Sequence, residues 1–127
     1  MKEYCVDYEI AEKLNENGFP QTTFCSYDIN GTFWHGCDEE YSAPNSDEIL
    51  KELPVVLKNK DRDFYYHSHI ERIEDENKEY YEISYGYFSY GEWVIPIILP
   101  MKVISEEKLS NALAKMWLYL KKESHIK

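Results

Sequence analysis

Two histidines one residue apart, His67 and His69, form the pattern in the sequence that is closest to a metal site. Side chains at positions i and i+2 of a strand share a face, so both imidazoles could bind one metal ion. A complete site usually needs three or four ligands, and no CxxC or HxxxH spacing accompanies the pair. Asp61 with Asp63 and the stretch 74–76 lack the regular spacing of an EF-hand. We therefore assign no metal ligand and no cofactor.

His35 and Cys37 are the second candidate pair, because a base next to a thiol can generate a nucleophile. Asp28 lies on the same face of the hairpin that is predicted below. A reactive cysteine needs a lowered pKa, whereas most free cysteines behave as small buried apolar residues. We therefore assign no catalytic residue and expect a protein that is not an enzyme. The odd number of cysteines, three, favours free thiols over a disulfide framework.

The chain is strongly acidic: 24 acidic residues against 14 basic ones give a formal net charge of −10. Such a surface repels phosphate groups, which argues against direct binding to nucleic acids and to anionic membranes. The acids concentrate at 38–48 and at 71–82. If both stretches lay on one face at phosphate-like spacing, the protein would mimic DNA.

The length of 127 residues and the apolar content of 43% predict one folded domain, 1–127, with a single hydrophobic core. No apolar run approaches the roughly 18 residues of a membrane-spanning helix. The first residues are acidic and lack the apolar segment of a secretory signal. These observations predict a cytoplasmic protein.

Apolar spacing and capping residues predict a first and a last helix. The first covers 8–16, with Asp7 as its cap and Gly18 as its stop. The last has Ser105 as its cap and ends with Lys121 and Lys122. Its predicted buried stripe consists of Leu109, Ala112, Leu113, Met116, Trp117 and Leu120.

A shorter helix is predicted over 47–53. Asn45 with Glu48 has capping-box spacing, and Ser46 is the competing cap. Pro54 stops the helix because its ring excludes a continuing turn.

Asn30-Gly31 predicts a two-residue type I′ turn, in which both central residues have positive φ. This register pairs Ile29 with Thr32, Tyr27 with Trp34 and Cys25 with Gly36. The predicted core face carries Cys25, Tyr27, Ile29 and Trp34, and the opposite face carries Phe24, Ser26, Asp28, Phe33, His35 and Cys37. Cys25 and Cys37 therefore lie on opposite faces, which argues against a bond between them.

Further strands are predicted at 55–57, 64–73, 79–88 and 93–99. Alternation is clearest in 79–88, and Pro96 suits an edge position in the last segment. The three long segments resemble an antiparallel meander. The predicted fold is α+β: a mostly antiparallel sheet of about five strands with helices on one side, in the order α-β-β-α-(β)-β-β-β-α.

The segments VDYEIAEKLNENGFP and SAPNSDEILKELP resemble small uncharacterised proteins of bacterial prophages and mobile elements. The matching features are Gly18-Phe19 after the first helix, Ala43-Pro44-Asn45 before the second, and the last helix. The resemblance implies a genomic setting on a mobile element, and it assigns no site residue.

Twelve tyrosines and an aromatic content of 16% favour sheet structure and protein interfaces. The first hypothesis is therefore a non-catalytic accessory protein that binds another protein through an acidic, tyrosine-bearing surface. The alternatives are a DNA-mimic inhibitor of a nucleic-acid enzyme and a small metal or thiol enzyme. The latter would use His67 with His69, or His35 with Cys37.

Overall fold

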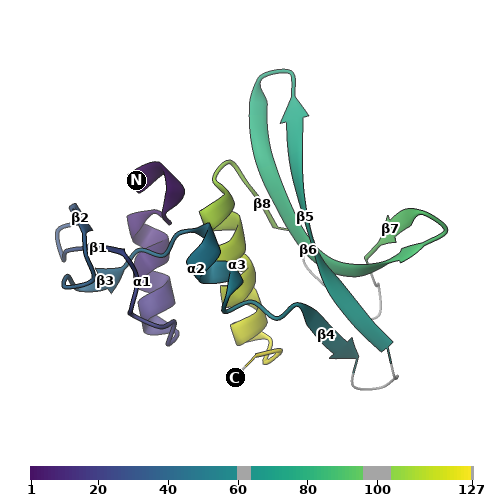
Figure 1. The fold of residues 1–127 in the computed structure, drawn as a ribbon, viewed down its shortest axis with the longest axis horizontal. Coiled ribbons are helices and arrows are strands. Elements are labelled where there is room, and N and C mark those ends of the chain that lie inside the picture. The colour runs from purple at the N-terminus through teal and green to yellow at the C-terminus, as the bar shows by residue number, and fades with distance from the viewer. Residues whose placement is uncertain (60–63, 96–103, 127) are drawn as a thin grey trace.

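The computed structural model in Figure 1 describes residues 1–59, 64–95 and 104–126. Within these ranges the chain forms three α-helices and two antiparallel sheets, so the predicted α+β class is confirmed. In chain order the elements are a 3-10 helix η1 (Lys2–Tyr4), α1 (Tyr8–Glu16), β1 (Cys25–Tyr27), β2 (Phe33–His35), β3 (Tyr41–Ser42), α2 (Ser46–Leu50), β4 (Val56–Asn59), β5 (Phe64–Asp75), β6 (Lys78–Ser89), β7 (Glu92–Val94), β8 (Ile104–Glu106) and α3 (Leu109–Lys122).

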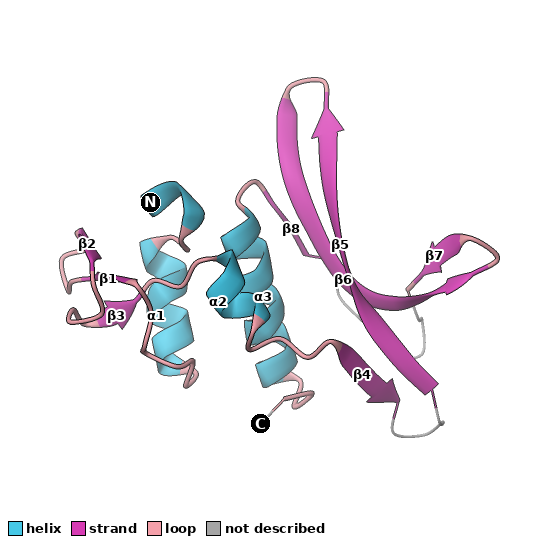
Figure 2. Cartoon of the chain, in the orientation of Figure 1, coloured by secondary structure: helices cyan, strands magenta, loops and turns pink. Residues whose placement is uncertain are grey.

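The strands form two sheets, whereas the sequence predicted one. The smaller sheet has the order β2-β1-β3, and the larger has the order β4-β5-β6-β7 with β8 paired to β6. Because residues 81–83 of β6 pair with both β5 and β8, these two strands lie on opposite edges of β6. Helix α3 packs against α1 and α2 and also against β6 and β8, so it joins the two halves of the molecule (Figure 2).

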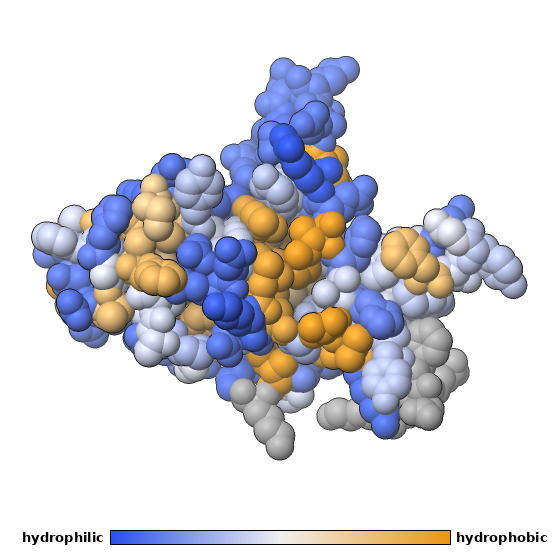
Figure 3. All heavy atoms as spheres, viewed as in Figure 1, coloured by the Kyte–Doolittle hydropathy of each residue, from blue (hydrophilic) through white to orange (hydrophobic). Residues whose placement is uncertain are grey.

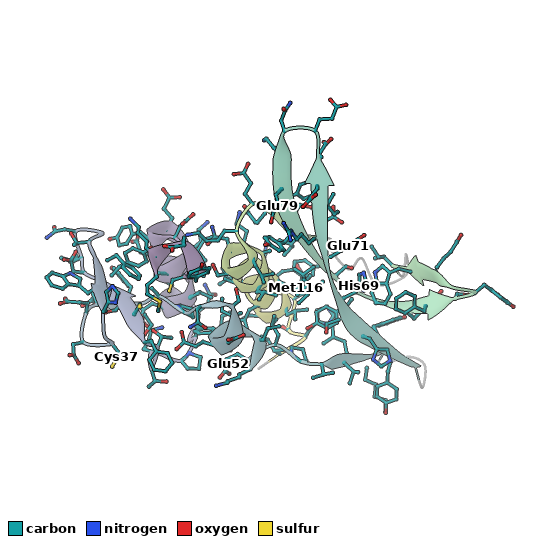
Figure 4. The ribbon with its side chains drawn as sticks, turned by 45° about the horizontal axis from the view of Figure 1, so that its top comes forward. Cys37, Glu52, His69, Glu71, Glu79 and Met116 are labelled. Carbon is teal, nitrogen blue, oxygen red and sulfur yellow. The ribbon has the colours of Figure 1, made fainter. Side chains whose placement is uncertain are left out.

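Helix α3 is buried on most of its surface, as expected for the central helix of a core. The predicted stripe is confirmed from Ala112 to Leu120, whereas Leu109 in the first turn is only half-buried. Figure 4 shows Met116 between the helix and the larger sheet. The predicted start is wrong: the helix begins at Leu109 with Lys108 in the cap position. Ser105 instead belongs to β8, opposite Glu82 of β6. Strand pairing therefore overrides the local capping signal at Ser105.

Helix α1 has its predicted bounds, but Asp7 does not cap it through its side chain. The Asp7 carboxylate accepts hydrogen bonds from Lys108 Nζ at 2.6 Å and from Asn111 Nδ2 at 2.8 Å. Burial would raise the pKa of Asp7, but these two hydrogen bonds outweigh burial and hold the pKa below its ordinary value. Asp7 thus ties the start of α1 to the start of α3. At the other end, Gly18 takes φ +83 and closes the helix.

Helix α2 has the predicted capping box: Asn45 accepts from the Glu48 N–H, and Glu48 accepts from the Asn45 N–H. Asn45 is therefore the cap, and Ser46 is the first helical residue. The helix ends at Leu50, earlier than predicted, because its last turn tightens: the Glu52 N–H bonds to the Ile49 carbonyl at 2.9 Å.

The hairpin of β1 and β2 differs from prediction by one residue in register. Its pairs are Cys25–His35, Ser26–Trp34 and Tyr27–Phe33. The Asp28 carboxylate accepts from the backbone N–H groups of Asn30 and Thr32 and from Trp34 Nε1. Gly31 alone takes positive φ in this turn, so it is a three-residue loop rather than type I′.

The register shift exchanges the faces of β2. Trp34, predicted to lie in the core, is 48% exposed, and Ile29 is also exposed. Phe33 takes the inner position and packs edge-on against Tyr27, with ring centroids 5.4 Å apart. His35 shares the face of Cys25, contrary to the prediction.

Strands β5 and β6 form a long hairpin whose tip projects away from the helices (Figure 1). Ile83 and Tyr85 are buried as predicted where the hairpin meets α3. Ser84 and Gly86, predicted to lie on the other side, are buried as well, because β7 and Trp93 cover that face. Figure 3 shows an apolar band between the helices and the larger sheet and a hydrophilic surface over the projecting end. Asp61, Asp63 and the predicted strand residues 96–99, with Pro96, lie outside the described residues.

Candidate functional site

His67 and His69 share the face of β5 that points away from the buried Tyr66, as predicted. They do not face a common ligand site. The His69 ring stacks on Trp93 with centroids 4.6 Å apart and meets the edge of Phe88 at 5.8 Å, whereas His67 is exposed. In the described ranges no three histidine, cysteine or acidic side chains group as a metal site would require.

His35, Cys37 and Asp28 do not form a catalytic arrangement. The His35 ring packs against Phe33 at 5.7 Å, and Cys37 is exposed after β2. Hydrogen bonds from Trp34 and from the turn backbone lower the pKa of Asp28 and occupy its carboxylate. Figure 4 shows Cys37 by the smaller sheet and His69 on the larger sheet, in different halves of the molecule. The two candidate pairs are therefore separate.

Several ionisable groups are buried in their neutral forms. The pKa of the Cys5 thiol is raised to about 12, mainly by burial and secondly by the neighbouring Cys25. Burial raises the pKa of Tyr27 to about 12, and it also raises the pKa of Tyr85. The hydroxyl of Tyr27 donates to the Val6 carbonyl at 2.8 Å. These groups stabilise the core and are poor nucleophiles.

We expect the free energy of unfolding to fall by about 1–3 kcal/mol as pH rises from about 9 to 11. The folded-state pKa values of Cys5 and Tyr27 lie above their unfolded values, so the unfolded state releases protons first. Their contribution is complete below pH 9 and is lost as pH approaches 12. Urea unfolding followed by circular dichroism measures this. In Tyr27→Phe the free energy of unfolding should fall less steeply with pH than in the wild type, whereas the exposed Tyr4→Phe should keep the wild-type slope. Equal slopes in the two variants would contradict the prediction.

A hollow of about 1050 Å³ lies at the first turn of α3. Its two described lysines are already paired: Lys108 with Asp7 at 2.6 Å and Lys78 with Glu107 at 3.6 Å. Ser110 Oγ is buried there without a hydrogen-bond partner among the described residues. With its cations neutralised by carboxylates, the hollow offers no unpaired charge for a ligand.

An aromatic patch on the larger sheet is the more informative surface, and we define it as His69, Phe88, Tyr90 and Trp93. The indole Nε1 of Trp93 donates to Ser84 Oγ at 3.0 Å, which fixes the ring under His69. Phe88 packs edge-on against Trp93 at 4.9 Å and is 65% exposed. Tyr90 is fully exposed in the adjoining turn.

No family model, curated protein or solved structure matches the chain. In the described ranges no helix has the length and apolar character to cross a membrane. The site must therefore be interpreted from its own geometry.

Sequence reasoning missed Phe88, Tyr90 and Trp93 as site residues. The available signal was the Tyr90-Gly91 step between two aromatic segments. Tyr90 at φ 51 and Gly91 at φ +81 form the two-residue turn with positive φ that was predicted at Asn30-Gly31. This turn brings Trp93 back beside Phe88.

Proposed function

We propose that the protein is a non-catalytic accessory protein that binds a basic surface of another protein through the aromatic patch. Tyrosine, tryptophan and phenylalanine supply large contact areas at low entropic cost and are enriched in protein interfaces. A phage-derived setting is part of the same proposal, as the sequence pattern of the helical segments predicts.

Tyr90 is the observation that carries the proposal. Among the described residues, Tyr90 and Ser124 are the non-glycine residues with positive φ. The left-handed conformation costs a residue with a Cβ roughly 1 kcal/mol. A side chain that is fully exposed gains little packing energy within this chain to offset that cost. Strained, exposed aromatic residues of this kind point to a contact made with another molecule.

The charge around the patch indicates a basic partner. Glu71 and Glu82 lie directly opposite each other beside His69, and exposed Glu92 follows the turn. Arginine side chains pair with carboxylates and also stack on aromatic rings. An arginine-bearing protein surface therefore fits both the charge and the rings.

The other candidate functions receive less support. The acids of 38–48 lie by the smaller sheet and α2, whereas those of 71–82 lie on the projecting hairpin (Figure 1). The described acids therefore do not form one continuous row like a DNA backbone. The separation of the histidine and cysteine pairs likewise gives no support to a metal or thiol enzyme.

We expect Tyr90→Asn to raise the free energy of unfolding by about 0.5–1 kcal/mol while it weakens partner binding. Asparagine tolerates positive φ and favours this turn before glycine, but it removes the exposed ring. Affinity purification from a lysate of the encoding organism, compared by mass spectrometry between wild type and variant, tests the binding. Urea unfolding tests the stability.

Phe24→Ala is the matched control, because Phe24 is 74% exposed on the other half of the molecule. Proteins recovered by the wild type and by this control, but lost with Tyr90→Asn and with Phe88→Ala, would support the proposal. Recovery of the same proteins by all variants, or of none above background by the wild type, would refute it.

A further inference from the structure

The outer edge of β5 is half occupied. Strand β4 pairs with residues 64–67 of β5, and the Ser68 N–H still donates to the Val55 carbonyl at 3.2 Å. Beyond Ser68 no described residue pairs with this edge, although β5 continues to Asp75. Among the described strands, β6 is therefore the one that pairs with residues 70–74.

The hydrogen-bond pattern shows which groups are free. Since Ser68 directs its N–H to the β4 side and the register with β6 is continuous, every second residue does the same. Ile70, Arg72 and Glu74 thus direct their N–H and C=O groups to the open edge. Unpaired groups of this kind form a template for a further strand.

Pro54 explains why the pairing stops. Its carbonyl accepts a hydrogen bond from Tyr85 OH at 2.6 Å, so the chain before β4 lies against the core face of the sheet. The next residue that could pair with this edge is Leu53, opposite Ile70, but its N–H donates to the Ile49 carbonyl of α2 at 3.1 Å. The chain leaves the edge at Val55, and Val55 remains 76% exposed beside the open segment.

The side chains along this edge have two different faces. Val55 and Ile70 lie on the face shared with buried Tyr66 and Tyr85, and both are exposed. Glu71 and Asp75 are on the opposite face. A strand with alternating apolar and basic side chains would cover the first pair and neutralise the second.

We propose that an extended segment of a basic partner protein, alternating apolar with arginine or lysine residues, adds to β5 at Ile70, Arg72 and Glu74. The inference rests on the proposed function in that the ligand is a protein, but it uses the open backbone edge of β5 and not the aromatic rings; the two surfaces adjoin at Glu71. A second copy of this chain fits less well. It would bring another edge with three acids and one arginine in residues 68–75 to a surface of the same charge.

The test uses a blocked peptide that alternates arginine and valine over about eight residues, a typical strand length. Hydrogen exchange read by NMR should show slower exchange at the amides of Ile70, Arg72 and Glu74 when the peptide is present. The corresponding peptide with glutamate in place of arginine should not bind. A higher salt concentration should weaken binding of the arginine peptide, because the carboxylates along this edge are exposed and their attraction to arginine is screened.

Ile70→Pro and Ile70→Ala form the matched pair of variants. Both remove the same side chain, but proline also removes an N–H that faces the open edge and not β6. We expect Ile70→Pro to bind the peptide at least about tenfold more weakly than Ile70→Ala, the effect of losing one or two hydrogen bonds. A peptide N-methylated at alternate residues tests the same bonds on the wild-type chain and should also fail to bind.

Equal binding by the two variants, or by the N-methylated peptide, would overturn the inference. So would protection of these amides in the chain alone together with a dimer in sedimentation, because that result assigns the edge to a second copy. Tyr90→Asn should leave peptide binding unchanged. If the peptide does not bind while Tyr90-dependent partner capture persists, the inference fails and the proposed function stands.

Discussion

Replacement of Trp117 by alanine is expected to lower the free energy of unfolding by about 3–5 kcal/mol, the usual cost of removing a buried indole. Trp117 lies in α3 with 4% of its surface exposed. Its ring meets the edge of Phe19 at 5.1 Å, so it joins α3 to the chain that follows α1. The cavity would therefore open between the two halves of the molecule.

Urea unfolding followed by circular dichroism and by one-dimensional NMR measures this loss. Lys122→Ala, on the exposed side of the same helix, is the control and should change stability by less than about 0.5 kcal/mol. Because α3 packs on both halves, the two probes should give coincident transitions, which would support one domain over 1–127. A Trp117→Ala loss below about 1 kcal/mol would contradict the role assigned to α3.

Gly86→Ala should have the second large effect, a loss of about 1–3 kcal/mol with displacement of β7. A Cβ at position 86 would overlap the carbonyl oxygen of Val94 and would lie 3.0 Å from the Trp93 ring. The obstruction by Val94 is backbone, so it yields only if β7 moves. Glycine in a strand often marks such a close approach of another backbone segment.

The displacement can be separated from general unfolding. Trp93 and His69 resonances should shift in Gly86→Ala, whereas the resonances of β1 and α1 should stay in place. Ser89→Ala, in the same strand, is the control and should have little effect on either. A Gly86→Ala spectrum that matches the wild type around Trp93 would show that β7 does not depend on this contact.

Local patterns in the sequence predicted the elements that depend on neighbours in the chain. The bounds of α1, the capping box of α2 and most of the stripe of α3 followed from spacing over one or two helical turns. The alternation of β6 was only partly correct, because β7 also buries Ser84 and Gly86 on its other face. The start of α3 did not, because Ser105 pairs with β6 across 23 residues of chain. Strands β3 and β8 are too short to show periodicity, and so the division into two sheets was missed.

The aromatic patch likewise depends on contacts that local sequence patterns do not predict. The sequence showed His69 and Trp93, but their stacking depends on the turn at Tyr90 and on Gly86, which lets β7 come close. The predicted two-residue turn at Asn30-Gly31 was wrong. The Asp28 side chain accepts three hydrogen bonds there, and a rule based on turn propensity does not include them. The open edge of β5 could not be predicted from the sequence either, because it depends on where β4 begins to pair with β5.

The bond between Asp7 and Asn111 has a consequence for how the molecule is made. It joins residues 104 positions apart, and the helix that holds Asn111 packs against α1, α2 and the larger sheet. During synthesis, the earlier elements leave the ribosome before their packing partner exists. Productive folding must therefore wait until residues 109–122 have emerged, and contacts of this sequence separation make it slow. Until then the apolar side of the long hairpin lacks the helix that covers it.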